Sequence, residues 1–137
     1  MTAKQYLSQL RTLERRIAWL RDDIATIRAE AEGAKSVDYG RIRVQTSPDP
    51  DPLATYIDRL AKQERRLLDL YNQRIEIAIK INMQLADLTP ALYADILYLR
   101  YVKGASLAEV ADILNYSYSR IRHLHGVALQ HFADKYL

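Results

Sequence analysis

Apolar residues recur along the first part of the chain at alternating steps of three and four positions. The pattern runs without a break through Ala3, Tyr6, Leu10, Leu13, Ile17, Leu20, Ile24, Ile27 and Ala31. This heptad spacing predicts an α-helix with one continuous apolar stripe, while charged residues of both signs cover its other faces. We therefore expect one long helix from Thr2 to about Glu32, ended by Gly33.

A second long helix is expected to begin at Asp51 and Pro52, because an N-cap residue followed by a first-turn proline favours a helix start. Its apolar residues keep the helical period, and Glu64 and Arg74 interrupt the stripe. They are Leu53, Ile57, Leu60, Leu67, Tyr71, Ile75, Ala78, Ile81 and Leu85. Neither helix can bury its stripe alone, since helices in proteins depend mainly on tertiary packing for stability.

Residues 33–52 separate the two helices, and their glycines and prolines are typical of a loop. The stretch RIRVQ at 41–45 is an alternative short strand. A connection of this length lets the chain return, so we favour an antiparallel, coiled-coil-like hairpin within one chain over a parallel dimeric coil. Two hairpins can also pair, and we therefore expect a homo-oligomer, a dimer, through the heptad helices.

The C-terminal part of the sequence carries a series of helix start and stop signals. Thr89 and Pro90 repeat the cap-and-proline start, and the apolar helix that follows is expected to end before Gly104, in the left-handed conformation. Ser106 and Glu109 form a capping box, which predicts a new helix from Leu107. Asn115 favours a left-handed turn after that short helix, and Ser117 can cap the next one.

The last helix, predicted over residues 118–135, has two distinct faces. Its apolar face is formed by Ile121, Leu124, Ala128 and Phe132, which lie within about 40° of one another on a helical wheel. Its outward face carries polar residues and a glycine, namely Tyr118, Ser119, Arg120, Arg122, His123, Gly126 and Gln130. A short helix, a turn and a helix with such a face predict a helix-turn-helix whose second helix enters the major groove of DNA.

The residue types of this face fit the chemistry of base recognition. Arginine can hold guanine through two hydrogen bonds, and hydroxyl and imidazole groups can donate or accept. A glycine at 126 would allow a close approach to the phosphate backbone. The residues that we predict to bind DNA are therefore Tyr118, Ser119, Arg120, Arg122, His123 and Gly126.

Residues 106–129, SLAEVADILNYSYSRIRHLHGVAL, resemble the helix-turn-helix of region 4 of bacterial primary sigma factors, and LYLRYVKGASL at 97–107 resembles the approach to it. The opening MTAKQYLSQLRTLERRI, the proline-rich loop and the ending LHGVALQHF are similar to sigma-region-4-like proteins of Gram-positive phages and prophages. These are related to late-transcription regulators of the ArpU and RinA type. The resemblance implies base contacts at Tyr118, Ser119, Arg122 and His123, and a backbone contact at Arg120.

Charge and composition limit the functions and partners that the chain can have. Lys plus Arg exceed Asp plus Glu by only 20 to 17, so DNA binding would have to come from geometry rather than from a basic tail. The chain has no cysteine, which excludes disulfides and thiolate metal sites. The charged N-terminus is unlike a signal peptide, and no apolar stretch is long enough to span a bilayer. We expect a protein of the bacterial cytoplasm without a membrane partner.

No arrangement of residues predicts an enzyme, a metal site or a cofactor. His123 and His125 point about 200° apart on a helix, so they cannot converge on a metal. His125 lies near the apolar arc and is interpreted as a packed histidine. The chain lacks a glycine-rich phosphate loop and a nucleophile with a paired base.

The sequence as a whole predicts an all-α protein. Residues 1–88 would form the helical hairpin arm with loop 33–52, and residues 89–137 the helix-turn-helix domain. Our first hypothesis is a sequence-specific regulator of phage or prophage late genes, with double-stranded DNA and RNA polymerase as partners. The alternatives are a small terminase-like packaging subunit, which would form rings of eight or more copies, and a helix-turn-helix module that binds only protein.

Overall fold

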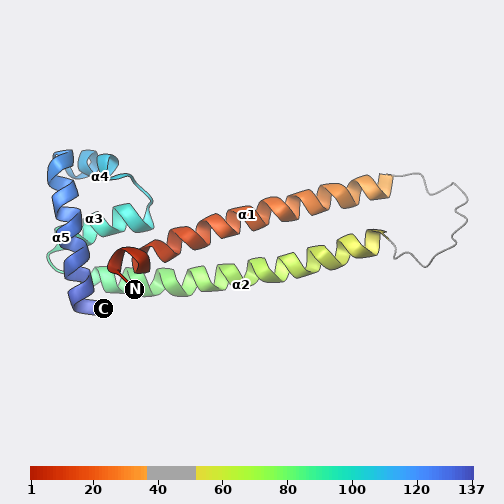
Figure 1. Cartoon of the computed structure of the whole chain (residues 1–137), viewed down its shortest axis with the longest axis horizontal. Coiled ribbons are helices and arrows are strands. Elements are labelled where there is room, and N and C mark those ends of the chain that lie inside the picture. Colours follow the sequence, from red (N-terminus) through yellow and green to blue (C-terminus); the bar gives the residue numbers. More distant parts are fainter. Residues whose placement is uncertain (37–51) are drawn as a thin grey trace, which may run out of the picture. The chain divides into compact units, whose positions relative to one another are not determined.

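The computed structural model describes residues 1–36 and 52–137, and all of their regular structure is helical. The elements are α1 (Ala3–Ser36), α2 (Pro52–Ala86), α3 (Ala91–Leu97), the π-helical turn η1 (Tyr98–Val102), α4 (Leu107–Leu114) and α5 (Tyr118–Tyr136), as Figure 1 shows. The predicted all-α class is confirmed, with two long helices followed by a helix-turn-helix.

Helix α1 begins at a capping box that sequence analysis did not identify. The Thr2 hydroxyl accepts from the Gln5 amide at 3.2 Å, and the Gln5 side chain accepts from the Thr2 amide at 2.9 Å. The predicted end at Gly33 is wrong, because α1 continues to Ser36. A glycine inside a helix costs only about 1 kcal/mol relative to alanine, and good helix formers follow it. The rest of the predicted loop, with the alternative strand at 41–45, lies outside the described residues.

The described helices divide into two compact units. One contains Met1–Glu14 and Gln73–Leu137, and the other contains Arg15–Asn72. The first turns of α1 and the last turns of α2 therefore share a unit with the C-terminal helices. The domain boundary that we placed between residues 88 and 89 remains a prediction.

In the unit of residues 15–72, α1 and α2 run antiparallel. The Gln63 side-chain amide donates to the Asp23 carboxylate at 2.6 Å, and Arg59 pairs with Glu30 at 3.8 Å. Ile17, which belongs to the predicted heptad stripe, is buried together with Ile24 and Ile27. The ion pair is about half exposed, so burial of the apolar stripe contributes more to stability than this pair does.

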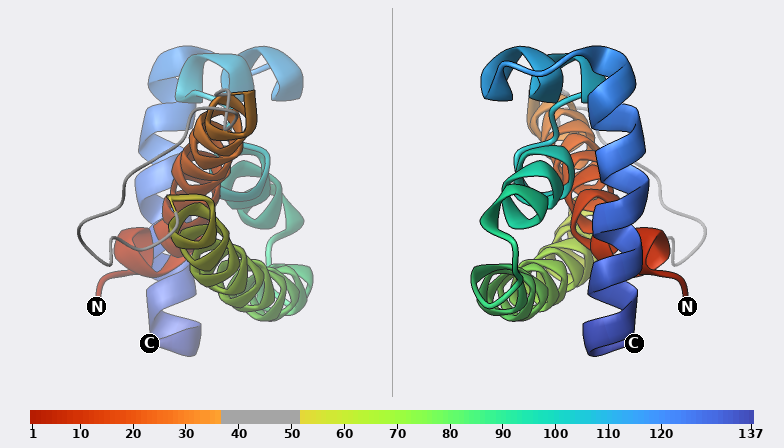
Figure 2. Two further views of the ribbon diagram at one scale, coloured as in Figure 1. Left: turned by 90° about the vertical axis from the view of Figure 1, so that its right-hand side faces the viewer. Right: turned by 90° about the vertical axis from the view of Figure 1, so that its left-hand side faces the viewer.

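In the unit that contains the C-terminal helices, one apolar core joins segments far apart in the sequence. Tyr6 donates to the Gln84 side chain at 2.8 Å, which fixes the antiparallel register of α1 and α2 here. The core holds Ala3, Leu7, Ile81, Leu85, Leu88, Leu97, Tyr101, Ala128 and Phe132. Figure 2 shows the beginning of α1 beside α5. Helix α5 is therefore supported by the start of α1 and the end of α2.

Two residues of the predicted α2 stripe are exposed, and only Ile81 and Leu85 of the stripe are buried. Ile57 and Ile75 are 58% and 52% exposed, so their assignment to the buried face was wrong. The physical reason is that α2 has apolar residues on two sides. The helical period identifies an apolar face, but it does not show whether another helix packs against that face. Ile79 and Met83 extend the exposed side in the unit of Ile75.

A second, smaller core lies within the helix-turn-helix itself and contains Ile96, Val110, Ala111, Ile121 and Leu124. Pro90 is extended and occupies the N-cap position without a side-chain cap, so α3 begins at Ala91, one residue later than predicted. Helix α3 then widens into η1, where the Lys103 amide donates to the Tyr98 carbonyl at 3.0 Å. The expected uninterrupted helix up to Gly104 therefore ends in a π-helical turn.

Gly104 adopts the predicted left-handed conformation, with φ of 79°. A Cβ at this position would lie 3.2 Å from the Arg11 guanidinium. We expect Gly104→Ala to lower the free energy of unfolding by about 1–2 kcal/mol, because the left-handed conformation is unfavourable for residues with a side chain. Urea denaturation followed by circular dichroism measures this change.

Gly126→Ala is the matched control for that substitution. Gly126 lies within α5, and a Cβ there would meet no other side chain within 4 Å. Alanine should raise the free energy of unfolding by up to about 1 kcal/mol at an open helical position. Equal losses of stability at the two glycines would contradict the role assigned to the left-handed turn at Gly104.

Candidate nucleic-acid interface

Helix α4 is fixed at both ends by the residues that the sequence predicted. The Ser106 hydroxyl accepts from the Glu109 amide at 3.2 Å, and the Glu109 carboxylate accepts from the Ser106 amide at 3.4 Å. At the other end, Asn115 is left-handed with φ of 60°. The predicted capping box and the predicted left-handed turn are both confirmed, and they set the direction of α5.

Helix α5 begins after Ser117, whose hydroxyl accepts from the Arg120 amide at 3.1 Å, as predicted. Its inward stripe is also confirmed, since Ile121, Leu124, Ala128 and Phe132 are all buried. This stripe contacts both cores and fixes the rotation of the helix. The opposite side of α5 must therefore face away from the protein.

The outward face of α5 presents the predicted DNA-binding residues, all of which are exposed. They are Tyr118, Ser119, Arg120, Arg122, His123 and Gly126. The Arg122 guanidinium lies 5.7 Å from the centre of the Tyr118 ring, at a distance typical of a cation–π contact. Neither Arg120 nor Arg122 forms an ion pair with a described residue. Their charges remain available for a ligand.

Each of these groups offers a different chemical contact. Arg122 can donate two parallel hydrogen bonds to one planar acceptor, and Ser119 and His123 can donate or accept. The surface at Gly126 is open, because no atom beyond its chain neighbours and the backbone of its own helix lies within 4 Å of where its Cβ would be. The N-terminal end of α5 also carries the positive end of the helix dipole, which favours a nearby anion.

His125 lies at the edge of the outward face and packs against η1, as its place near the apolar arc predicted. Its Nε2 lies 2.8 Å from the Tyr101 hydroxyl, and the two rings are stacked with centroids 5.7 Å apart. Burial lowers the pKa of His125, and the positive charges of Arg100 and Lys4 lower it further. Burial also raises the pKa of Tyr101, although Arg100 opposes this. No local sequence signal predicts the Tyr101 contact, because Tyr101 lies in the π-helical turn.

The lowered pKa of His125 predicts a loss of stability in mild acid. The unfolded chain takes up the proton near the ordinary value of 6.5, whereas the folded protein resists it. The free energy of unfolding should therefore fall as the pH drops below about 6.5. Denaturation at pH 7.5 and pH 5 measures this fall, which should shrink in His125→Gln. Ser119→Ala, at an exposed position of the same helix, leaves every histidine in place and is the control, which should keep the full fall.

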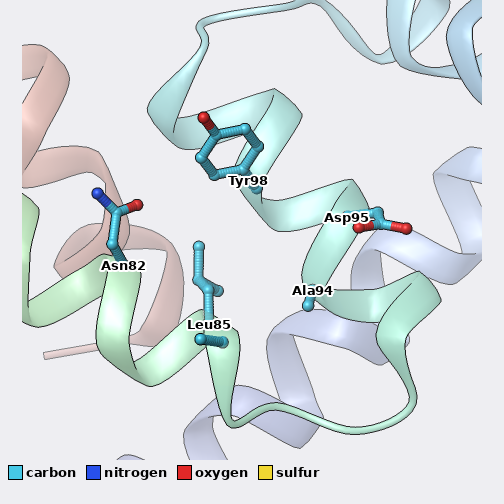
Figure 3. Close-up of a pocket in the computed structure, with 6 residues that line it drawn as sticks. Asn82, Leu85, Ala94, Asp95 and Tyr98 are labelled. Atoms are coloured by element: carbon cyan, nitrogen blue, oxygen red, sulfur yellow. The ribbon is translucent and has the colours of Figure 1, made fainter.

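A shallow groove lies between the end of α2 and α3 in the same unit. It is lined by Asn82, Leu85, Ala86, Ala94, Asp95 and Tyr98 (Figure 3). Its surface is mainly apolar, and Asp95 is the one ionisable acid in the lining. Such a lining suits the packing of an apolar side chain from a partner better than chemistry on a polar substrate.

Within residues 1–36 and 52–137, no group of three or more His, Cys, Asp or Glu side chains is arranged to hold a metal ion. None of the helices in this part of the chain combines the length and the apolar character needed to cross a membrane.

The comparisons with known proteins assign the C-terminal part of the chain. Residues 85–132 match the family model for Sigma-70, region 4. Comparisons with curated proteins and with solved structures give no significant match. The matched range spans α3, η1, α4 and most of α5, including the outward residues from Tyr118 to Gly126. Residues 85–132 therefore contain a Sigma-70 region 4 domain, a helix-turn-helix DNA-binding fold.

Proposed function

We propose that this chain is a sequence-specific transcription regulator that reads the major groove of double-stranded DNA with α5. The observation that carries the proposal is the outward face of α5, where the exposed Tyr118, Ser119, Arg122 and His123 lie opposite a fully buried stripe. In helix-turn-helix proteins, residues near the start of the second helix contact base edges. These four residues lie in the first two turns of α5.

We assign a role to each predicted DNA-binding residue of this face other than Tyr118. Arg122 would donate to O6 and N7 of a guanine, since this bidentate contact is the commonest specific contact in the major groove. Arg120 would contact a phosphate beside the groove, and Gly126 would let the sugar–phosphate backbone come close. Ser119 and His123 would discriminate neighbouring bases through single hydrogen bonds.

We also propose that the regulated genes belong to a phage or prophage and are expressed late. The support is the resemblance of the chain's opening, its proline-rich loop and its ending to sigma-region-4-like phage proteins related to the ArpU and RinA type. A regulator of this kind would place its helix-turn-helix on a late promoter and would contact RNA polymerase there. Footprinting on the late promoter of a phage that encodes this chain would show protection, and an unprotected promoter would refute the late-gene role.

Selection of bound duplexes from a pool of random DNA tests the DNA-binding proposal. We expect one common motif to be enriched, and the logarithm of the binding constant for that duplex should fall linearly with the logarithm of salt concentration. The random DNA pool that has not been selected by binding to the protein is the control. Absence of enrichment together with absence of binding at 50 mM salt would refute the proposed function.

A dimer would suit the modest charge of the chain, because two copies contact more phosphates than one. Most of the predicted heptad stripe of α1 is buried within the chain, so little of it is available for a second copy. We propose instead that a second copy packs on the exposed side of α2, where Ile75, Ile79 and Met83 are each more than half exposed. Asn82 and Ala86 of the groove share this side of the helix.

The joint substitution of Ile75, Ile79 and Met83 by glutamine should convert the dimer to a monomer, because it removes the apolar area that drives association. Light scattering at several concentrations measures the mass, and Trp19→Gln, which removes another exposed apolar side chain, is the control. If the parent chain has the mass of a monomer at every concentration, the proposed dimer is wrong. A closed assembly of eight or more copies would favour the packaging alternative.

A further inference from the structure

The first turns of α1 bring positive charge to the loop that precedes the helix-turn-helix. The Arg11 guanidinium lies against Gly104, with Nη2 3.2 Å from where a Cβ would be. Lys103, the residue before Gly104, is exposed, and Arg100 donates to the Ala105 carbonyl at 3.2 Å. Three cations from two distant parts of the sequence therefore surround one short loop.

A fourth cation connects this group to α5. Lys4, on the first turn of α1, lies close enough to His125 for its positive charge to lower the pKa of the imidazole. The charge of Arg100 acts in the same direction. His125 follows Arg122 by three positions, so the two side chains lie on neighbouring parts of the α5 surface. Lys4 of α1 and Arg100 of η1 therefore add positive charge near His125, which lies next to Arg122 along α5. Figures 1 and 2 show the start of α1 beside α5.

These four cations differ from Arg28, Arg59 and Arg74, each of which pairs with a carboxylate. None of Lys4, Arg11, Arg100 and Lys103 forms an ion pair with a described residue, whereas Arg74 pairs with Glu14 at 3.2 Å in the same unit. Gathering like charges on one surface is unfavourable unless a counterion is present. A row of phosphates is such a counterion, and its neutralisation releases condensed cations into solution.

We propose that Lys4 and Arg11 contact the phosphate backbone of the same duplex that α5 reads, so that the beginning of α1 forms part of the DNA-binding surface. This inference rests on the proposed function. Both residues lie outside the range that matches Sigma-70 region 4, so they would be an addition made by this chain to that domain. They would add phosphate contacts to a chain whose near-neutral composition provides few of them.

The test measures DNA affinity against salt concentration for the full chain and for the double variant Lys4→Gln, Arg11→Gln, using the duplex obtained by selection. Each lost phosphate contact should lower the slope of log binding constant against log salt by about 0.9, so the double variant should lose about 1.8. Because phosphate contacts carry no sequence information, affinity for non-selected duplexes should fall by the same factor.

The matched control is Arg16→Gln, Arg21→Gln, which removes the same charge from exposed positions further along α1 and should leave the slope unchanged. Arg11→Lys keeps the charge without the guanidinium packing and should keep the slope. Equal slopes for the parent chain and the Lys4, Arg11 double variant would overturn this inference and leave the proposed function intact. If the parent chain binds no DNA, the proposed function fails first, and this inference fails with it.

Discussion

Replacement of Phe132 by alanine is expected to lower the free energy of unfolding by about 3–5 kcal/mol, the usual cost of removing a large aromatic side chain from a core. Phe132 is fully buried, and its ring lies 5.7 Å from that of Tyr6 and 4.9 Å from that of Tyr136. The cavity would open between α5 and the first turns of α1, where Leu7 is also fully buried. Urea denaturation followed by far-UV circular dichroism measures the loss.

Tyr118→Ala is the control for Phe132→Ala, because it removes an aromatic ring that is 52% exposed on the same helix. Its effect on stability should stay within about 0.5 kcal/mol, as for most surface substitutions. The double variant Leu7→Ala, Phe132→Ala should also be measured. Its loss in free energy of unfolding should differ from the sum of the losses in the two single variants, since both residues line one core. A loss below 1 kcal/mol for Phe132→Ala would contradict the shared core of α1 and α5.

Arg122→Ala is expected to reduce affinity for the selected duplex by about 1–3 kcal/mol, which is roughly a 5-fold to 150-fold change, and to relax the preference at one base pair. The reason is that a bidentate contact to guanine would be lost. The Arg122 guanidinium lies 5.7 Å from the centre of the Tyr118 ring, so the contribution of Arg122 should depend on Tyr118. Fluorescence anisotropy with duplexes varied at each position measures both quantities.

Arg120→Ala provides the contrast, since a phosphate contact carries no base preference. This variant should bind all duplexes more weakly by the same factor, with the salt slope lower by about 0.9. Arg65→Ala, at an exposed position of α2, is the control and should bind like the parent chain. Parent-like affinity in both Arg120→Ala and Arg122→Ala would mean that this face of α5 does not contact DNA.

Features that depend on neighbouring residues were predictable from the sequence. Ser106 and Glu109, Asn115 and Ser117 act on the backbone within a few positions of themselves, so their residue types identify the ends of α4 and the start of α5. The buried stripe of α5 and most of the α1 stripe follow from the helical period. The outward position of the candidate DNA-binding residues then follows, because a helix with one buried stripe exposes the opposite side.

Features that depend on tertiary packing were not predictable. The period marks apolar faces without naming their partners, so it assigned the exposed Ile57 and Ile75 to the buried face and omitted Leu7, which is fully buried. The π-helical turn and the contact of Arg11 with Gly104 connect residues with no local sequence signal. These contacts decide where Tyr101, His125 and the cations of α1 lie. The flank of the candidate interface therefore became visible only in the structure.

A titration of the isotope-labelled full chain with the selected duplex, followed by backbone amide chemical shifts, shows whether the outward face of α5 binds DNA. We expect the largest shift changes at Tyr118 to Gly126, with smaller changes at Lys4, Arg11 and Lys103. The control is a duplex with the selected motif scrambled, which should shift fewer of the α5 amides. Changes confined to the exposed side of α2, with the α5 amides unmoved, would mean that α5 does not bind DNA.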